Sequence, residues 1–439
     1  MHPTRRALAI TALGTALAVF PIAVSPDLWV LWLGAWAVFF IAMLVDLLRL
    51  PALADLELHP ELPTTIYMGE SSTLRLHLAW ADIPEQRPIR GELALSLEGP
   101  ITAPPVATRP LSRRRTTLEL PLTPRRRGRT RLEGLHLRWH GPFGLMQRTG
   151  FLPIAKDLDA TPNLRAVRQL AARFASKNEL RQGLRIERFL GDGTEFDSLR
   201  EFMAGLDRRS IDWKSSARHT KLLARHHRAE RDRQIVIAID TGHLMAEPLD
   251  GLPRLDHAIH AGLLLALMST RSGDRVGLYA FGDRPRAFTE PRSGMAAFTS
   301  TLEVAAGLDY GESETNFTLG LTHLMQRLTR RSLVIVMTDF TDSITAELMV
   351  ENLQRLANRH LVLFVSLRDP LLDRLVAARP DDLVTLQRSV VADSLIRERE
   401  VVLQRLRQRG IQCLDASPSE VGMSLINRYL DIKRRELIG

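Results

Sequence analysis

The stretch Gln234–Asp240, which reads QIVIAID, decides the fold of the C-terminal half of the chain. It is a continuous apolar run that ends at an acidic residue, and Ser332–Thr338 (SLVIVMT), followed by Asp339, repeats this design. Strands without polar alternation are buried on both faces, as in a parallel sheet covered by helices. The pattern predicts an α/β domain with a doubly wound, mostly parallel sheet over residues 234–439.

Helical and strand patterns alternate around these two strands. Helices are expected at 256–270, 345–357, 386–409 and 419–434, and strands at 275–281, 361–366 and 411–414. Residues 315–328 predict a further helix with Thr315 as its N-cap. Ligands of such sheets bind beyond the carboxyl ends of the strands, so Asp240 and Asp339 are expected at a functional edge. No glycine-rich phosphate loop follows a strand, which argues against a nucleotide site.

Residues 161–233 form a basic segment that precedes this domain. Its part from 165 to 233 holds 17 Lys and Arg against 10 Asp and Glu, and so supplies most of the net charge of +9. Acids and bases interleave, which favours an ion-pair network bracing two domains, with Trp213 as a buried wedge. Aromatic residues for stacking on bases are few, so we expect no nucleic-acid binding.

Residues 51–160 show short alternating stretches between Pro, Gly and charged residues. Several short strands separated by turns predict a small β-sandwich-like domain. The arginine clusters 113–115 and 125–127 are interpreted as charges that protect strand edges or contact anionic lipid.

Two uncharged runs, Ala7–Val24 and Leu28–Val45, lie near the start of the chain with three residues between them. Each is long enough to span a bilayer, which predicts a transmembrane helical hairpin over residues 1–50. A cleaved signal peptide is the alternative, because Arg5 and Arg6 precede the first run. Basic residues at both outer ends place both termini and the bulk of the chain in the cytoplasm, at the inner membrane.

The overall composition excludes several classes of protein. Apolar residues at 45% and charged residues at 25% are globular values, not those of a disordered or fibrous chain. The single cysteine, Cys413, excludes a disulfide framework and multi-cysteine metal sites. No catalytic constellation can be argued from spacing, so we expect a protein that is not an enzyme.

A resemblance to a known family is carried by residues 193–240, which read GTEFDSLREFMAGLDRRSIDWKSSARHTKLLARHHRAERDRQIVIAID. This segment is similar to the signature of the bacterial family called domain of unknown function fifty-eight. The resemblance covers nearly the whole chain, including GPFGL at 141–145, and implies an α/β end with a von Willebrand factor A-like fold. Its structural signature residues are Glu195, Phe196, Arg200, Asp207, Arg209, Asp212, Trp213, Lys214 and Arg218.

The resemblance also raises the question of a metal. The von Willebrand factor A fold that the resemblance implies often holds Mg²⁺ through an Asp-x-Ser-x-Ser loop, a Thr and a further Asp. These residues supply the oxygen ligands that this ion prefers. Asp240, Thr315 and Asp339 match that pattern, but Gly242 and Leu244 stand at the two hydroxyl positions. We expect no cofactor, and at most weak Mg²⁺ binding. The favoured interpretation is that both aspartates cap nearby amides while Thr315 caps its own helix. A bound metal and another small ligand are the alternatives.

These observations predict a membrane-anchored cytoplasmic interaction or scaffold protein. Members of the family are commonly encoded beside MoxR-type AAA+ ATPases, so such an ATPase is the suspected partner, in assembly or envelope-related processes. Two alternatives are a metal-dependent enzyme that uses the strand-end aspartates and, less favoured, a nucleic-acid-binding membrane protein. The partner-binding edge is expected to expose Asp240, His243, Glu312, Glu314, Thr315 and Asp339.

Overall fold

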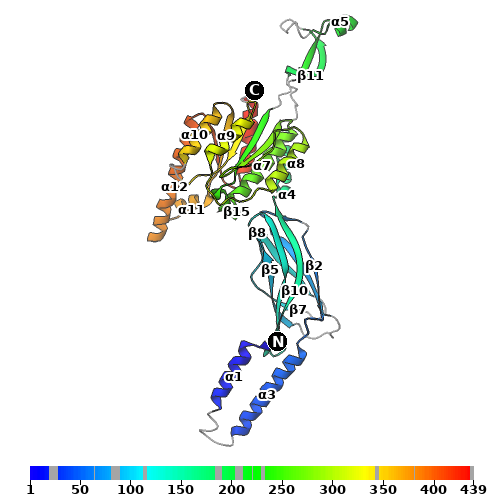
Figure 1. Cartoon of the computed structure of the whole chain (residues 1–439), viewed down its shortest axis with the longest axis vertical. Helices are drawn as coiled ribbons and strands as arrows, with labels where there is room; N and C mark the ends of the chain where they lie inside the picture. The colour runs from blue at the N-terminus through cyan, green and yellow to red at the C-terminus, as the bar shows by residue number, and fades with distance from the viewer. Residues whose placement is uncertain are drawn as a thin grey trace. The chain divides into compact units, whose positions relative to one another are not determined.

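A computed structural model describes the chain in two compact units, Met1–Pro162 and Asn163–Gly439 (Figure 1). The described residues are all except 19–27, 64, 81–88, 112–115, 183–189, 203–210, 220, 229–232, 342–345, 380 and 436–439. This division groups nearly all of the basic segment with the α/β unit.

The first unit contains two mainly antiparallel sheets. One has the order β1-β10-β9-β5-β7, with β3 parallel to β10, and the other has the order β2-β4-β8-β6. Alternate leucines such as Leu74, Leu76 and Leu78 of β4 are buried, which explains the alternating sequence. The strands are β1 (His2–Pro3), β2 (Leu56–Glu61), β3 (Ile66–Tyr67), β4 (Ser72–Trp80), β5 (Ile89–Glu98), β6 (Ile101–Thr102), β7 (Ala107–Leu111), β8 (Thr116–Pro124), β9 (Gly128–His140) and β10 (Met146–Thr161).

Two helices, α1 (Arg5–Leu17) and α3 (Leu28–Arg49), also belong to this unit. Among the described residues, α3 is the one helix long and apolar enough to cross a membrane, with a mean hydropathy of 2.2 over Trp29–Arg49. The first predicted run, Ala7–Val24, lies partly outside the described residues. The Trp32 indole donates a hydrogen bond to the Gly14 carbonyl oxygen (3.2 Å), so the two helices are in contact.

The second unit is built on a six-stranded sheet with the order β17-β16-β13-β18-β19-β20. Its strands are parallel except β17, and the predicted α/β architecture is confirmed. Along β13, alternate residues pack into cores on opposite faces, Ile235 on one and Val236 on the other. The strands are β13 (Gln234–Asp240), β16 (Arg275–Phe281), β17 (Pro285–Phe288), β18 (Leu333–Met337), β19 (Leu361–Leu367) and β20 (Gln412–Ala416).

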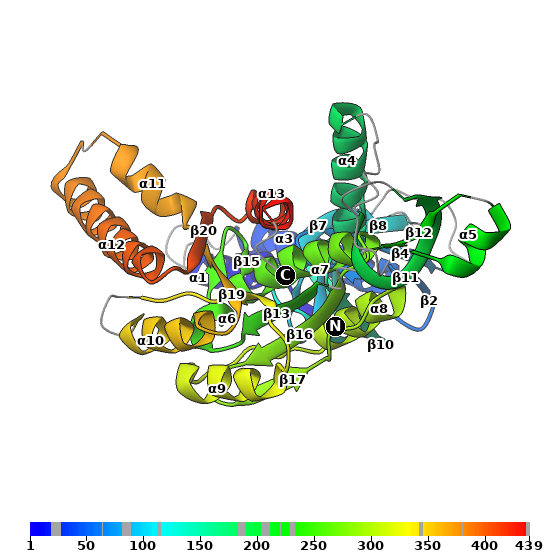
Figure 2. The same ribbon diagram turned by 90° about the horizontal axis from the view of Figure 1, so that it is seen from above.

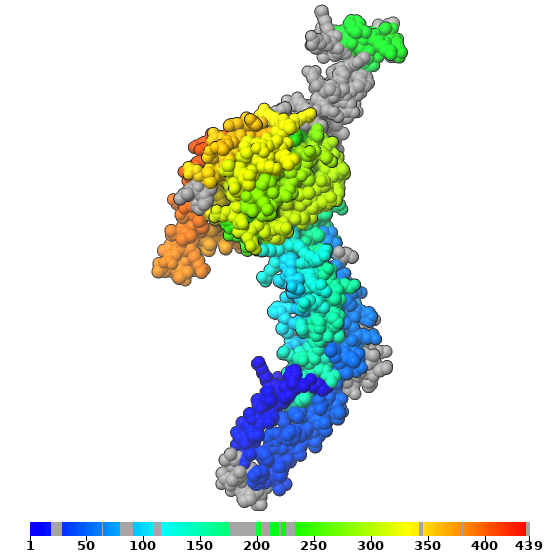
Figure 3. All heavy atoms as spheres, viewed as in Figure 1, coloured from blue at the N-terminus to red at the C-terminus, as the bar shows by residue number. Residues whose placement is uncertain are grey.

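Helices cover both faces of this sheet. Figure 2 shows α7 and α13 on one side and α9 and α10 on the other. The helices α11 and α12 form a pair that projects from the body of the unit (Figure 3). The helices are α4 (Leu164–Gln182), α5 (Trp213–His219), α6 (His243–Ala246), α7 (Arg254–Arg271), α8 (Met295–Ala306), α9 (Phe317–Arg327), α10 (Ala346–Ala357), α11 (Pro370–Ala377), α12 (Leu383–Gln408) and α13 (Val421–Arg434).

Two short antiparallel pairs complete the unit: β11 (Leu190–Glu201) with β12 (Leu223–Arg228), and β14 (Pro248–Leu249) with β15 (Leu252–Pro253). The signature residues Glu195, Phe196 and Arg200 lie on β11. Asp207 and Arg209 lie outside the described residues. Whether the segment braces two domains stays a prediction.

The expectation of a buried Trp213 is wrong, because its side chain is 69% exposed. The reason is the register of α5. Asp212 and Ser216 are buried and occupy the same helical face, so Trp213 points outward, as do the exposed Lys214 and Arg218. Asp212 caps this helix by accepting a hydrogen bond from the Ser215 amide (3.1 Å).

We predict that Trp213→Ala changes the free energy of unfolding by less than about 0.5 kcal/mol, since exposed positions without special contacts tolerate substitution. Asp212→Ala serves as the contrast and is expected to cost about 1 kcal/mol, because it removes a helix cap. Denaturant titration of both variants measures the difference. A large loss in Trp213→Ala alone would restore the buried-wedge interpretation.

Candidate functional site

Asp240 ends β13 at the carboxyl edge of the sheet and is only 2% exposed. Its Oδ1 accepts hydrogen bonds from the Thr315 hydroxyl (2.6 Å) and the Gly242 amide (2.8 Å), and its Oδ2 accepts one from the Thr338 hydroxyl (2.5 Å). Burial raises the pKa of this carboxyl, while the donated hydrogen bonds oppose that shift. The structure thus brings together Asp240 and Thr315, two of the three predicted metal ligands.

The helix that follows Thr315 begins later than predicted. It starts at Phe317, and the Asn316 side chain caps it by accepting a hydrogen bond from the Leu319 amide (3.0 Å). Asn is at least as good a cap as Thr, so the neighbouring residue takes this role. The Thr315 hydroxyl is then turned to Asp240 instead of capping its own helix.

Gly242 is required by the close approach of the loops at this edge. A Cβ atom at Gly242 would lie 2.1 Å from the Thr315 hydroxyl oxygen. Gly311 is similar, because a Cβ atom there would lie 2.3 Å from the Thr241 carbonyl oxygen. The position at which an adhesion-type site carries a serine therefore has no room for a side chain in this chain.

Asp339 follows β18 and is 5% exposed. Its Oδ1 accepts hydrogen bonds from the Arg399 guanidinium (2.9 Å) and the Phe340 amide (3.0 Å), and its Oδ2 forms an ion pair with Arg254. Arg399 also contacts the Asp415 carboxylate (3.1 Å). Although burial alone would lower the pKa of Arg399, the two carboxylates raise it. A buried carboxylate needs such pairing to stay ionised.

These contacts do not fit a Mg²⁺ site. Magnesium demands near-octahedral oxygen coordination, whereas both oxygens of Asp240 receive hydroxyl or amide donors and both oxygens of Asp339 receive guanidinium groups. Within the described part of the chain, no three His, Cys, Asp or Glu side chains converge on a point. The two arginines neutralise the carboxylate that would face a metal ion.

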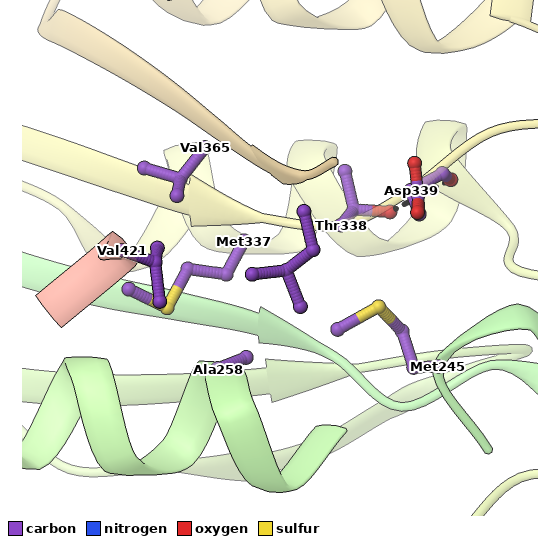
Figure 4. A pocket seen from close by; sticks show the side chains of 8 residues that line it. Met245, Ala258, Met337, Thr338, Asp339, Val365 and Val421 are labelled. Carbon is purple, nitrogen blue, oxygen red and sulfur yellow. Dashed lines mark hydrogen bonds between the residues drawn. The ribbon is translucent and has the colours of Figure 1, made fainter. Parts of the chain in front are cut away.

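A small apolar hollow lies beside Asp339 (Figure 4). Its free volume of about 10 Å³ is room for roughly one water molecule. Such a hollow cannot admit an organic substrate. Its lining is made by Met245, Ala258, Met337, Thr338, Asp339, Val365, Leu367 and Val421.

The expectation that Asp240 and Asp339 are exposed at a partner-binding edge is wrong, because both are buried. Backbone hydrogen bonds fold the loops over the strand ends, from the Gly311 amide to the Thr241 carbonyl (2.8 Å) and from the His243 amide to the Ser313 carbonyl (3.0 Å). The exposed members of the predicted edge are Glu312 and Glu314, and His243 and Thr315 are half-buried.

Sequence reasoning missed three residues of this site: Thr338, Arg254 and Arg399. Thr338 directly precedes Asp339, and that adjacency was the one available signal. Arg254 opens α7 and Arg399 lies within α12, so neither is near Asp339 in the sequence. Nothing in their local patterns separates them from the many surface arginines.

The helix α12 carries a group of exposed apolar side chains, called here the apolar stripe. Spacings of three, four and seven recur among its residues, and two adjacent pairs widen the stripe to about half of the helix circumference. A cluster of exposed apolar side chains marks an interaction site more often than an isolated exposed leucine does. The stripe consists of Leu383, Val384, Leu386, Val390, Val391 and Leu395.

The fold and the edge define an α/β unit with a mostly parallel sheet, in which Asp240 is held by hydroxyl and amide donors and Asp339 is neutralised by two arginines. Residues 198–384 match the family described as "Protein of unknown function DUF58". No curated protein matches the chain.

Several solved structures are similar to part of the chain, and three of them are described here. The conserved hypothetical protein BatB from Bacteroides thetaiotaomicron is 14% identical, with 44% of this chain and 98% of that chain covered and a TM-score of 0.29. An aerotolerance-related membrane protein from Bacteroides fragilis is 14% identical, with coverages of 46% and 99% and a TM-score of 0.30. The manganese-loaded TRAP protein of Plasmodium vivax is 17% identical, with coverages of 34% and 65% and a TM-score of 0.24. Scores this low carry no argument about function.

We predict that Gly242→Ser lowers stability by about 1–3 kcal/mol through overpacking and does not create Mg²⁺-dependent stabilisation. Gly307→Ser is the matched control, because a Cβ atom there meets nothing closer than 3.6 Å. Thermal melting with and without millimolar Mg²⁺ measures both effects. A rise in melting temperature on adding Mg²⁺ to Gly242→Ser would contradict this interpretation of the edge.

A pH prediction follows from the raised pKa of Asp240. The folded state holds this proton more tightly than the unfolded state, whose aspartates titrate near pH ~3.9. The contribution of Asp240 to the free energy of unfolding is therefore full below the unfolded pKa and is lost as the pH rises through the folded pKa. Asp240→Asn should remove this component and flatten the dependence.

The measurement is urea unfolding across acidic and neutral pH. Asn can still accept hydrogen bonds from Gly242 and Thr315, so Asp240→Asn should fold, whereas Asp240→Ala strands its buried donors and should cost about 1–3 kcal/mol. Identical pH profiles for the parent and Asp240→Asn would refute the raised pKa.

Proposed function

We propose that the chain is a membrane-anchored interaction protein whose α/β unit docks a protein partner on the cytoplasmic side of the inner membrane. The observation that carries this proposal is the exposed apolar stripe of α12. The buried carboxylates of Asp240 and Asp339 also support a binding function over a catalytic one. Both already have internal partners, so they offer neither a free carboxylate nor an open coordination position for catalysis.

A two-helix hairpin is the proposed anchor. His2 and Pro3, directly before α1, pair with β10, and α3 leads into β2 of the same unit. Both outer ends of the hairpin thus meet one water-exposed β unit, which is consistent with two crossings between them. Arg5, Arg6 and Arg49 at these ends favour the cytoplasmic side.

A MoxR-type AAA+ ATPase is the proposed partner, in assembly or envelope-related processes. This choice rests on the resemblance of residues 193–240 to the signature segment, and the structure contributes the surface on which a partner could dock. The enzyme and nucleic-acid alternatives have no observation in their favour. We therefore propose neither a reaction nor a nucleic-acid ligand.

We predict that Val390→Asp abolishes recovery of a MoxR-type ATPase in a crosslinked pull-down from native membranes, because it places a charge in the centre of the stripe. Leu348→Asp is the control: Leu348 is equally exposed, on α10. Asp240→Asn should retain the partner, since Asp240 is buried. Full recovery with Val390→Asp would exclude the stripe as the docking surface.

A further inference from the structure

Asp46 lies in the last turn of α3, yet it is 0% exposed. Its carboxylate accepts hydrogen bonds from three backbone amides, those of Phe143 (2.7 Å), Leu145 (2.6 Å) and Met146 (3.1 Å). The Phe143 and Leu145 amides belong to the turn between β9 and β10, and the Met146 amide is that of the first residue of β10. A carboxylate bound by three amides fixes the turn against the end of the helix.

The start of α1 is fastened to the same turn. The Thr4 amide donates a hydrogen bond to the Leu145 carbonyl oxygen (2.8 Å), and the Thr4 hydroxyl donates one to the Gly144 carbonyl oxygen (2.8 Å). Gly141 is required here, because a Cβ atom would lie 2.5 Å from the Asp46 carboxyl carbon. The GPFGL segment therefore binds both the start of α1, through Thr4, and the end of α3, through Asp46.

The level of this turn along α3 follows from the helix itself. Its 22 residues extend about 33 Å at 1.5 Å per residue, close to the ~30 Å of a bilayer core. Asp46 lies one helical turn before the end of α3 at Arg49. Leu44 and Leu48, on either side of Asp46 in sequence, are exposed, Leu48 at 75%. The apolar outer surface of α3 thus continues past the level of the turn.

Phe143 is the large apolar residue that this turn presents, with its side chain 59% exposed. Charged groups of both signs act on His140, the neighbour of Gly141. Burial is the largest cause that lowers its pKa, Arg138 and Arg6 lower it further, and Glu92 and Asp46 oppose the shift. An exposed apolar ring, in a turn bonded to the residue that precedes Arg5 and Arg6, matches the layer at the end of a membrane helix where headgroups meet acyl chains.

We propose that the turn Gly141–Leu145 is a membrane-contact site, with Phe143 inserted among the lipids of an anionic bilayer. The contact holds the β unit against the membrane surface. This inference rests on the proposed membrane span of α3. Its ligand is the phospholipid bilayer itself.

The test uses the full-length protein in vesicles of phosphatidylethanolamine and phosphatidylglycerol. Cys413 is the single cysteine of the chain, so Cys413→Ser leaves a chain free of cysteine. Burial raises the pKa of the Cys413 thiol to about 11. Single cysteines then carry a nitroxide label whose depth is read from collisions with oxygen and with a water-soluble nickel chelate. The labelled variants are Phe143→Cys, Ile41→Cys and Phe151→Cys.

Ile41 is exposed within α3 and reports the span, while Phe151 is an exposed aromatic further along β10 and is the matched control. We expect lipid-like accessibility at 143 and 41 and water-like accessibility at 151. A water-like label at 143 with a lipid-like label at 41 overturns the contact but leaves the span intact. Water-like labels at both 143 and 41 overturn the span as well.

Discussion

The carboxylate of Asp339 lies between two guanidinium groups, and the carboxyl edge of the α/β unit depends on this pairing. Arg254 comes from α7, whose side chains fill the core on one face of the sheet, and Arg399 comes from α12, which contributes to the core on the other face. One buried charge therefore joins the two helical layers at the end of β18. Removing either arginine would leave that charge partly uncompensated, which is costly in a protein interior. Arg399 also anchors the helix that carries the apolar stripe, so the proposed docking surface depends on the same pair.

The sequence predicted the parts of this unit that depend on local pattern. The apolar runs of β13 and β18 identified the sheet, and the strand-end position of Asp240 placed it at the edge. The burial of Asp339 was not predictable, because Arg399 lies 60 residues away and helical spacing does not reveal which surface arginine folds inward. The prediction that Trp213 is buried was wrong for a related reason. Asp212 and Ser216 decide which side of the short helix α5 faces inward, and the size of the aromatic side chain does not.

The N-terminal unit follows the same physical rule as the α/β edge, because a buried carboxylate there is also satisfied by distant groups. Asp46 in an apolar helix gives no indication, from sequence alone, of the turn that it binds 97 to 100 residues later. The glycine at 141 becomes explicable only once the carboxylate is seen against its backbone. In both units a buried carboxylate is satisfied by groups distant in sequence, and in both it fixes a surface that we propose makes a contact, with a protein at α12 and with lipid at Phe143.

A double-mutant cycle on Asp339→Asn and Arg399→Gln tests whether arginine compensates the charge of Asp339 from within the protein. Urea unfolding of the full chain in detergent, with and without Mg²⁺, gives the coupling free energy. We predict a coupling of about 2 kcal/mol or more that Mg²⁺ does not change, as for a buried ion pair in contact. A coupling below about 0.5 kcal/mol, or one that Mg²⁺ abolishes while stabilising the parent, would contradict it.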